Sequence, residues 1–158
     1  MLVYGIPSFK LEKDVVEAEI DVMRQMGVDI KTGVEVGKDI TIDELKKQGY
    51  KAFYIAIGCQ GGRKINVPGE DADGVMTGVD FLHITTDDEN YKLAGDTVVI
   101  GGGNVAIDVS RSAVRCDSAN VYQVSLETRD IMPALPEEIE LAESCLLYTS
   151  PEPTRLRC

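Results

Sequence analysis

The sequence is poor in basic residues and histidine. It has 16 basic and 27 acidic residues among 158, which gives a formal net charge of −11. A surface this acidic repels phosphate, so we expect neither nucleic acid nor an anionic membrane to be the main partner. The single histidine, His83, stands in an apolar stretch at residues 81–84. We interpret it as a packed side chain rather than a metal ligand or a catalytic base.

Cysteine spacing and hydropathy exclude further classes. The four cysteines contain no C-x-x-C pair, a spacing that suits neither zinc, nor an iron–sulfur cluster, nor a redox-active disulfide. We therefore expect no metal ligands and reduced thiols in a cytoplasmic protein. No apolar run approaches the ~20 residues of a membrane span. The first residues also lack the basic and apolar regions of a secretory signal.

Helical and strand patterns alternate along the chain. Apolar periodicity predicts helices at 14–26, 80–84 and 136–144. Thr41 and Glu44 have the spacing of a capping box and predict a short helix through Lys47. Continuous apolar runs predict a buried strand at 52–57 and short strands at 28–32 and 34–36. Glycines and prolines predict a loop at 58–69, and a polar connector follows at 85–95.

The most informative stretch is a glycine-rich turn at residues 101–106. An apolar run at 97–100 precedes it, a helical pattern to about Arg115 follows, and a second apolar run covers 120–126. Strand, glycine turn, helix and strand form the order of a dinucleotide-binding βαβ unit. The sequence therefore predicts an α/β fold with a Rossmann-like βαβ unit in its second half. The alternative is an ordinary glycine turn in an α/β sheet.

Each part of this unit has a physical role. Gly101 permits the tight turn, and Gly103 lets a pyrophosphate approach the backbone without meeting a Cβ. Ala106 is small enough for close packing of helix and strand, and the helix N-terminus offers free N–H groups. Glu127, after the second strand, stands where a carboxylate accepts hydrogen bonds from the adenosine ribose. The predicted dinucleotide-binding residues are Gly101, Gly102, Gly103, Asn104, Val105, Ala106 and Glu127.

A succession of motifs carries a family resemblance over most of the chain. Gly5-Ile6-Pro7-Ser8-Phe9-Lys10-Leu11 begins it, and Ala56-Ile57-Gly58 and Val67-Pro68-Gly69-Glu70-Asp71 continue it. It runs on through residues 78–82, 98–108 and 132–139. In these motifs the chain closely resembles the flavin and nicotinamide domains of the glutamate synthase small subunit, which dihydropyrimidine dehydrogenase shares.

The resemblance implies a flavoprotein with two dinucleotide-binding domains, the nicotinamide domain being inserted into the flavin domain. Electrons then pass from NAD(P)H to FAD and on to iron–sulfur clusters or a partner subunit, such as a large catalytic subunit. It also implies that Lys10 contacts FAD, that Val36 lies at the adenine end, and that Gly58 closes a strand against the flavin nucleotide. Alternatively, Lys10 is a solvated surface lysine and Val36 a core residue. Asp108 and Arg111 are interpretable as an ordinary exposed ion pair.

The resemblance further implies an internal fragment that is inactive alone. We expect a partial FAD-binding domain at 1–84 without its phosphate-binding turn, the start of the NAD(P)-binding domain at 85–145, and a non-native or disordered tail at 146–158. The isolated chain should then not hold FAD stoichiometrically. Leu126 and Glu127 replace two basic residues of NADPH-using relatives, which predicts a preference for NADH. A non-catalytic dinucleotide-binding regulatory module is the alternative, and the final electron acceptor stays open.

Overall fold

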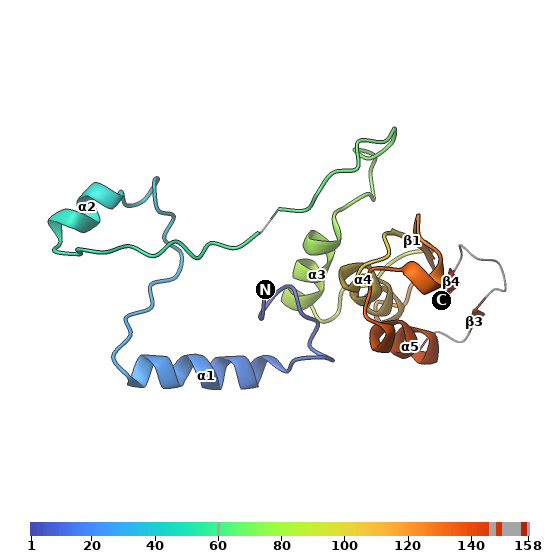
Figure 1. The fold of residues 1–158 in the computed structure, drawn as a ribbon, viewed down its shortest axis with the longest axis horizontal. Helices are drawn as coiled ribbons and strands as arrows, with labels where there is room; N and C mark the ends of the chain where they lie inside the picture. The colour runs from blue at the N-terminus through green and yellow to red at the C-terminus, as the bar shows by residue number, and fades with distance from the viewer. Residues whose placement is uncertain (60, 146–147, 150–155, 158) are drawn as a thin grey trace. The chain divides into compact units, whose positions relative to one another are not determined.

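The computed structural model describes residues 1–59, 61–145, 148–149 and 156–157. The chain divides into two compact units (Figure 1). The first combines Met1–Glu12 with Gly61–Cys158, and the second is Lys13–Gln60. The division follows contacts within the chain and leaves the predicted flavin and nicotinamide domains as predictions.

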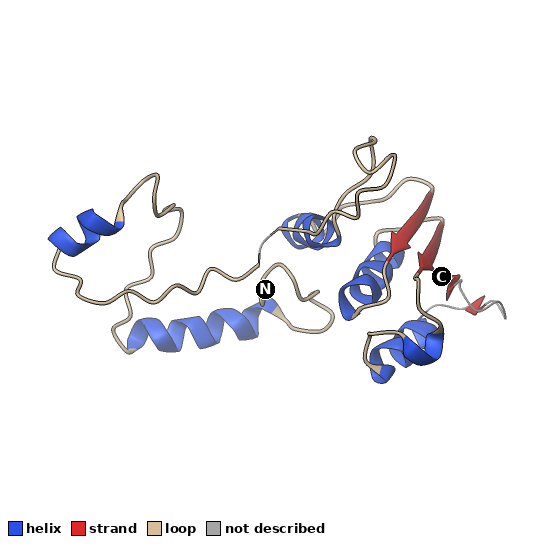
Figure 2. Cartoon of the chain, turned by 45° about the horizontal axis from the view of Figure 1, so that its top comes forward, coloured by secondary structure: helices blue, strands red, loops and turns tan. Residues whose placement is uncertain are grey.

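A parallel βαβ unit forms the centre of the first unit. It consists of β1 (Asp96–Ile100), α4 (Asn104–Arg115) and β2 (Asn120–Val124). The two strands run side by side in the same direction (Figure 2), and their register joins Asp96 to Asn120 and Ile100 to Val124. The predicted strand–turn–helix–strand order is therefore confirmed.

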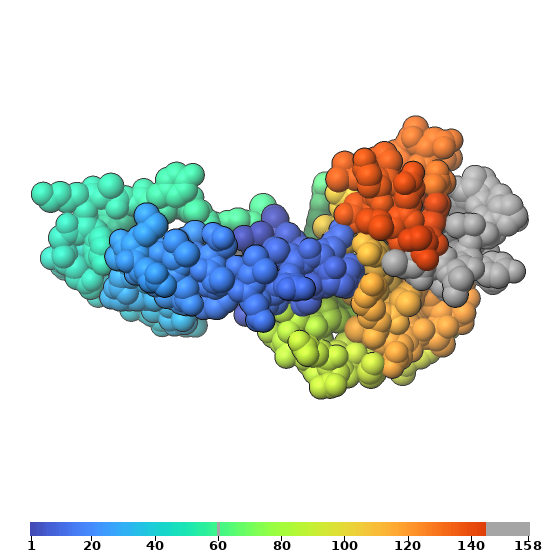
Figure 3. Space-filling view, turned by 90° about the horizontal axis from the view of Figure 1, so that it is seen from below, coloured from blue at the N-terminus to red at the C-terminus, as the bar shows by residue number. Residues whose placement is uncertain are grey.

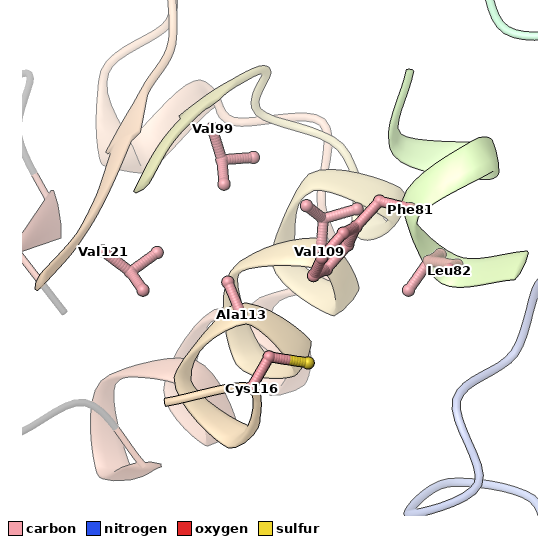
Figure 4. Packing of buried hydrophobic residues seen from close by; sticks show 7 residues of the cluster. All are labelled: Phe81, Leu82, Val99, Val109, Ala113, Cys116 and Val121. Atoms are coloured by element: carbon pink, nitrogen blue, oxygen red, sulfur yellow. The ribbon is translucent and has the colours of Figure 1, made fainter. Parts of the chain in front are cut away.

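A buried apolar cluster joins α4 to the strands and to α3 (Gly78–Asp87). Figure 4 shows its side chains converging from these four elements. Val109 and Ala113 lie on one face of α4 because they are four residues apart, Cys116 follows as the C-cap of the helix, and the strands contribute single inward residues. The cluster contains Phe81, Leu82, Val99, Val109, Ala113, Cys116 and Val121.

A second cluster lies between α4 and α5 (Pro136–Cys145). Ile107 of α4 is completely buried there and packs with Ala134, Ile139 and Ala142. A short 3-10 helix, η1 (Arg129–Ile131), precedes α5. Figure 3 shows the orange-red atoms of this region gathered beside the gold atoms of α4. The predicted helix at 136–144 is confirmed.

The remaining described strands are β3 (Tyr148–Thr149) and β4 (Leu156–Arg157). They extend the sheet to the order β1-β2-β4-β3, with β4 antiparallel to both β2 and β3. The rest of the predicted tail at 146–158 lies outside the described residues. Its assignment as a non-native tail stays a prediction.

The second unit contains two helices, α1 (Lys13–Gln25) and α2 (Ile42–Lys47). The capping box that starts α2 is confirmed. The Thr41 hydroxyl accepts from the Glu44 amide at 3.2 Å, and the Glu44 carboxylate accepts from the Thr41 amide at 2.8 Å. Among the described residues 13–59, Val16 alone is buried. This unit therefore has little core of its own.

The strands predicted at 28–32, 34–36 and 52–57 are absent, and this prediction was wrong. Residues 13–59 contain no strand, only an isolated bridge between Val36 and Ile40. The run at 52–57 is exposed rather than buried, with Tyr54 at 94% and Ile55 at 74%. A strand needs a second strand beside it to form a ladder, and the described residues 13–59 contain none.

The helix predicted at 80–84 is longer than expected. It begins after Thr77, whose hydroxyl caps the Asp80 amide at 3.2 Å, and it includes the first residues of the predicted connector. The loop at 58–69 contains no helix or strand among its described residues, as expected. None of the helices in the described ranges is long and apolar enough to cross a membrane.

His83, interpreted from the sequence as a packed side chain, lies on the exposed side of α3 and outside the apolar cluster. Phe81 and Leu82 face the apolar cluster, and a helix turns by about 100° per residue, which carries the next side chain outward. The His83 side chain is half exposed, with its ring 4.0 Å from that of Tyr4 and its Nε2 3.3 Å from the Asp87 carboxylate.

Candidate dinucleotide-binding site

The glycine turn leaves β1 at Gly101, which has a φ of +146° that favours glycine. Its amide still donates to the Val124 carbonyl at 2.8 Å, as in the ladder of the sheet. A Cβ built on Gly101 would lie 3.3 Å from the Cβ of Ala106. The turn and the first turn of α4 are therefore packed closely, and the small side chain at 106 suits this contact.

Gly102 and Gly103 have opposite surroundings. A Cβ on Gly102 would meet the Glu127 carboxylate at 3.0 Å and both Met132 and Ser125 at 3.1 Å. A Cβ on Gly103 would meet no atom within 4 Å. A side chain at position 102 would thus crowd the protein's own packing, which the sequence did not indicate. The open backbone at Gly103 has the geometry expected for the approach of a pyrophosphate.

The N-terminus of α4 opens at this same position. Gly103 is its N-cap and offers no side chain to cap the helix, so the first amides carry no side-chain acceptor. Unpaired amides and the positive end of the helix dipole favour a negatively charged group. The open turn and the uncapped helix together fit a phosphate group.

The segment at 132–135 lies against the turn, a contact that sequence reasoning missed. The Ala134 amide donates to the Gly102 carbonyl at 3.0 Å, and the Leu135 amide donates to Oδ1 of Asn104 at 2.8 Å. The Asn104 side chain therefore binds the protein backbone. The Met132-Pro133-Ala134 motif was the available signal, but a motif does not disclose what it packs against.

Glu127 follows β2, and its role as an acceptor for the ribose hydroxyls stays a prediction. Its carboxylate is beside Gly102, and its carbonyl accepts from the Ser125 hydroxyl at 2.7 Å, which fixes the backbone after β2. Leu126 is fully exposed. A carboxylate thus stands directly at the glycine turn.

The nearby Arg129 is held by a different acid. Its Nε and one terminal nitrogen each donate to Glu143 of α5 at 2.7 Å. This two-bond pairing holds the pKa of the Glu143 carboxyl below its usual range. Arg129 is therefore engaged with α5 rather than with Glu127.

Lys10 is partly buried between α4 and α5, so the alternative of a solvated surface lysine was wrong. Its ammonium lies 2.7 Å from both the Asp108 and the Glu138 carboxylates. Burial lowers the pKa of the Lys10 ammonium, but the hydrogen bonds to these two acids outweigh burial and raise it above its ordinary value. The predicted contact with FAD stays a prediction.

Asp108 and Arg111 do not form the exposed ion pair considered from the sequence. Both residues are buried, and each turns to a different partner. Asp108 pairs with Lys10, and Arg111 lies 3.6 Å from Glu138. The Arg111 guanidinium also stacks 4.6 Å from the centre of the Phe9 ring, where Arg115 approaches to 3.9 Å. The two side chains are buried rather than exposed because residues 9–10 cover this face of α4.

Val36 and Gly58 belong to the second unit. Val36 is 58% exposed, so it is not the core residue offered as an alternative. Gly58 has a φ of +64° and nothing within 4 Å of a built Cβ. It closes no strand, because residues 52–57 form none. Whether either residue contacts a flavin stays a prediction.

Comparison with known proteins agrees with this geometry. Residues 3–145 match the family model described as pyridine nucleotide-disulphide oxidoreductase. The chain is 39% identical over 147 residues to the NADP(+)-dependent formate dehydrogenase subunit beta of Moorella thermoacetica, covering 91% of this chain and 21% of that protein. It is 38% identical over 133 residues to the NADPH glutamate synthase small chain of Bacillus subtilis, covering 78% of this chain and 27% of that one.

A solved structure shares the fold. A variant of FprA from Mycobacterium tuberculosis aligns with a TM-score of 0.63 at 21% identity, covering 90% of this chain and 37% of that chain. The chain spans about a fifth to a quarter of the length of the two curated relatives above. The family match extends over both compact units as far as α5. This chain belongs to the pyridine nucleotide-disulphide oxidoreductase family.

Proposed function

We propose that this chain binds the adenosine and pyrophosphate parts of a nicotinamide dinucleotide within a flavin-dependent oxidoreductase of the glutamate synthase small-subunit type. The observation that carries the proposal is the open backbone at Gly103 in front of the uncapped α4, with the Glu127 carboxylate beside the turn. The amides at the start of α4 can donate hydrogen bonds to a phosphate, and the Glu127 carboxylate can accept hydrogen bonds from ribose hydroxyls.

The residues of this chain bind and orient, while the cofactors supply the hydride chemistry when they are bound. The amides that begin α4 face the pyrophosphate, and Glu127 accepts from the ribose. Lys10, Val36 and Gly58 belong to the flavin side of the proposal. We assign 1–84 to the flavin domain and 85–145 to the nicotinamide domain.

Beyond this chain, the proposal has electrons pass from NAD(P)H to FAD and on to iron–sulfur centres or a partner such as a large catalytic subunit. The oxidoreductase names of the relatives favour this function over a regulatory module. Cys59 and Cys116 are free thiols, which supports a cytoplasmic location.

The proposal includes a preference for NADH over NADPH, although the two relatives described above are named for NADP(H). A 2′-phosphate at this end of β2 would meet the Glu127 carboxylate and suffer like-charge repulsion. Leu126 offers it no positive charge, and Arg129 is occupied by Glu143. Repulsion of this kind costs on the order of 1–3 kcal/mol, or roughly ten- to a hundredfold in relative affinity.

The test compares the binding of NADH and NADPH to the 158-residue chain, followed by NMR shifts of the amides at 101–106. We expect the wild type to favour NADH and Glu127→Arg to reverse the order. Glu89→Arg makes the same charge change at an exposed acid outside the turn and should leave the ratio unchanged. Equal or tighter binding of NADPH by the wild type would refute the preference. Absence of any shift at 101–106 with either dinucleotide would refute the binding site itself.

A further inference from the structure

A buried polar chain connects α4, β2 and the glycine turn. The Ser110 hydroxyl of α4 donates to Oε1 of Gln123 at 2.9 Å, and Nε2 of Gln123 donates to the Gly101 carbonyl at 3.0 Å. Ser110 is completely buried and Gln123 is 2% exposed. Three separate elements are thus joined by two hydrogen bonds within the core.

An amide is an unusual choice at this position. Gln123 lies on the same face of β2 as Val121, which is 1% exposed and belongs to the apolar cluster under α4. Burying a carboxamide costs free energy unless its donors and acceptor are paired, whereas an apolar side chain would pack there without such partners. The hydrogen bonds offset this cost, and one of them ends on the turn.

The hydrogen bond to Gly101 determines how the next peptide is oriented. The Gly101 amide continues the sheet ladder by bonding the Val124 carbonyl, but its own carbonyl turns inward to Gln123. In a planar trans peptide, the C=O and the following N–H point in opposite directions. Holding the Gly101 carbonyl inward therefore directs the Gly102 N–H away from the core.

We propose that Gln123, supported by Ser110, is a positioning residue that holds the turn in the shape that accepts a pyrophosphate. This inference rests on the proposed function, because it assigns the Gly102 amide to the set of donors facing the dinucleotide. Gln123 itself touches no ligand and acts through the Gly101 peptide.

The experiment uses the full 158-residue chain with ADP-ribose as the probe. Gln123→Met preserves the approximate length of the side chain but removes both hydrogen bonds. We expect it to shift the Gly102 amide resonance in the ligand-free chain and to weaken ADP-ribose binding about three- to tenfold, the effect of one lost hydrogen bond. Ser110→Ala should change the Gly102 amide resonance and the affinity for ADP-ribose in the same direction, but by a smaller amount. Ser112→Ala is the matched control, since it removes a buried hydroxyl of the same helix outside this chain of bonds.

Gln123→Glu separates positioning from general packing. A neutral carboxyl can accept from Ser110 and donate to the Gly101 carbonyl as the amide does, whereas an ionised one faces that carbonyl with negative charge. Burial raises the pKa of a carboxyl. We therefore expect this variant to bind ADP-ribose like the wild type in mild acid and to lose affinity as the pH rises, while the wild type changes little over the same range.

The outcomes distinguish the two proposals. Failure of the wild type to bind ADP-ribose would refute the proposed function and with it the role of Gln123 in binding. Binding by the wild type together with an unchanged Gly102 resonance and unchanged affinity in Gln123→Met would refute the inference alone. A Gln123→Glu variant whose affinity is independent of pH would also count against it.

Discussion

Two apolar runs of similar composition adopt different structures in this chain. The run that begins near residue 97 becomes β1, pairs with β2 along its length and carries the buried Val99. The run at 52–57 forms no strand and leaves Ile55 74% exposed. Apolar β-prone residues are therefore not enough to form a strand; a neighbour and a covering helix are also needed.

The βαβ unit supplies both the neighbouring strand and the covering helix within one short segment. The glycine turn reverses the chain, α4 covers the sheet, and β2 arrives in register after it. The unit that contains 52–57 has two helices but no strand among its described residues. A change in the first unit should therefore have a larger effect than a matched change in the second, and equal responses would contradict this difference.

The largest expected difference concerns core truncation. Ile107 is completely buried between α4 and α5, so Ile107→Ala should lower the free energy of unfolding by about 2–5 kcal/mol, through lost burial and a cavity. Ile55→Ala removes an exposed side chain and should change it by less than about 0.5 kcal/mol. Urea unfolding followed by circular dichroism measures both.

Comparable losses in the two variants would show that the run at 52–57 packs as tightly as α4, contrary to the structure. The unfolding slope should also stay the same in Ile55→Ala, because little additional surface is exposed.

Local patterns in the sequence predicted the fold well where the structure depends only on residues close together in the sequence. The capping box at Thr41 and Glu44 and the glycine turn depend on residues within a few positions of one another, and both were correct. The strand at 52–57 failed because strand pairing depends on partners distant in sequence. The pairing of Lys10 with Asp108 could not be predicted for the same reason, since nearly a hundred positions separate the two residues.

In the candidate site, too, some features follow from local sequence and others depend on residues farther along the chain. The open backbone at Gly103 and the place of Glu127 follow from the order of the βαβ elements. The crowding at Gly102 and the hydrogen bond to Asn104 come from residues 125–135, whose path after β2 no periodic pattern encodes.

The next largest difference concerns two ion-paired lysines, one with acids that are largely buried and one with an exposed acid. Lys10→Met would leave the acids Asp108 and Glu138, whose side chains are 11% and 18% exposed, without their shared cation. We expect a loss of about 1–3 kcal/mol, because desolvated carboxylates lose their main compensation. Lys31→Met removes an exposed ion pair with Asp29 and should cost at most a few tenths of a kcal/mol.

Thermal or urea unfolding compares the two lysine variants directly. Lys10→Arg is the control that retains the positive charge, and it should recover part of the loss. A Lys10→Met chain as stable as Lys31→Met would contradict the buried pairing.

A smaller difference concerns helix caps. Thr77 caps α3, which packs on α4, so Thr77→Ala should lower the free energy of unfolding of the first unit by about 0.5–2 kcal/mol. Thr41→Ala removes an equivalent cap from α2, which has no buried residue. It should reduce local helicity at 42–47, visible in NMR shifts, without moving the main transition. Serine at either position retains the hydroxyl and should restore the wild-type result.

The smallest expected difference concerns pH. The pKa of the Glu143 carboxyl is lowered by its pairing with Arg129, and that of Glu44 by the Thr41 amide. A carboxyl whose pKa is lower in the folded state stabilises the fold above its unfolded pKa and loses this contribution as the pH falls through the folded value. The first unit should therefore weaken below about pH 4.5, and Glu143→Gln should flatten this dependence. Glu44→Gln should leave the pH dependence of the main transition unchanged, because α2 contributes nothing to that core. An unfolding midpoint that depends on pH identically in the wild type and Glu143→Gln would contradict the pairing of Arg129 with α5, and would leave that guanidinium available to a 2′-phosphate.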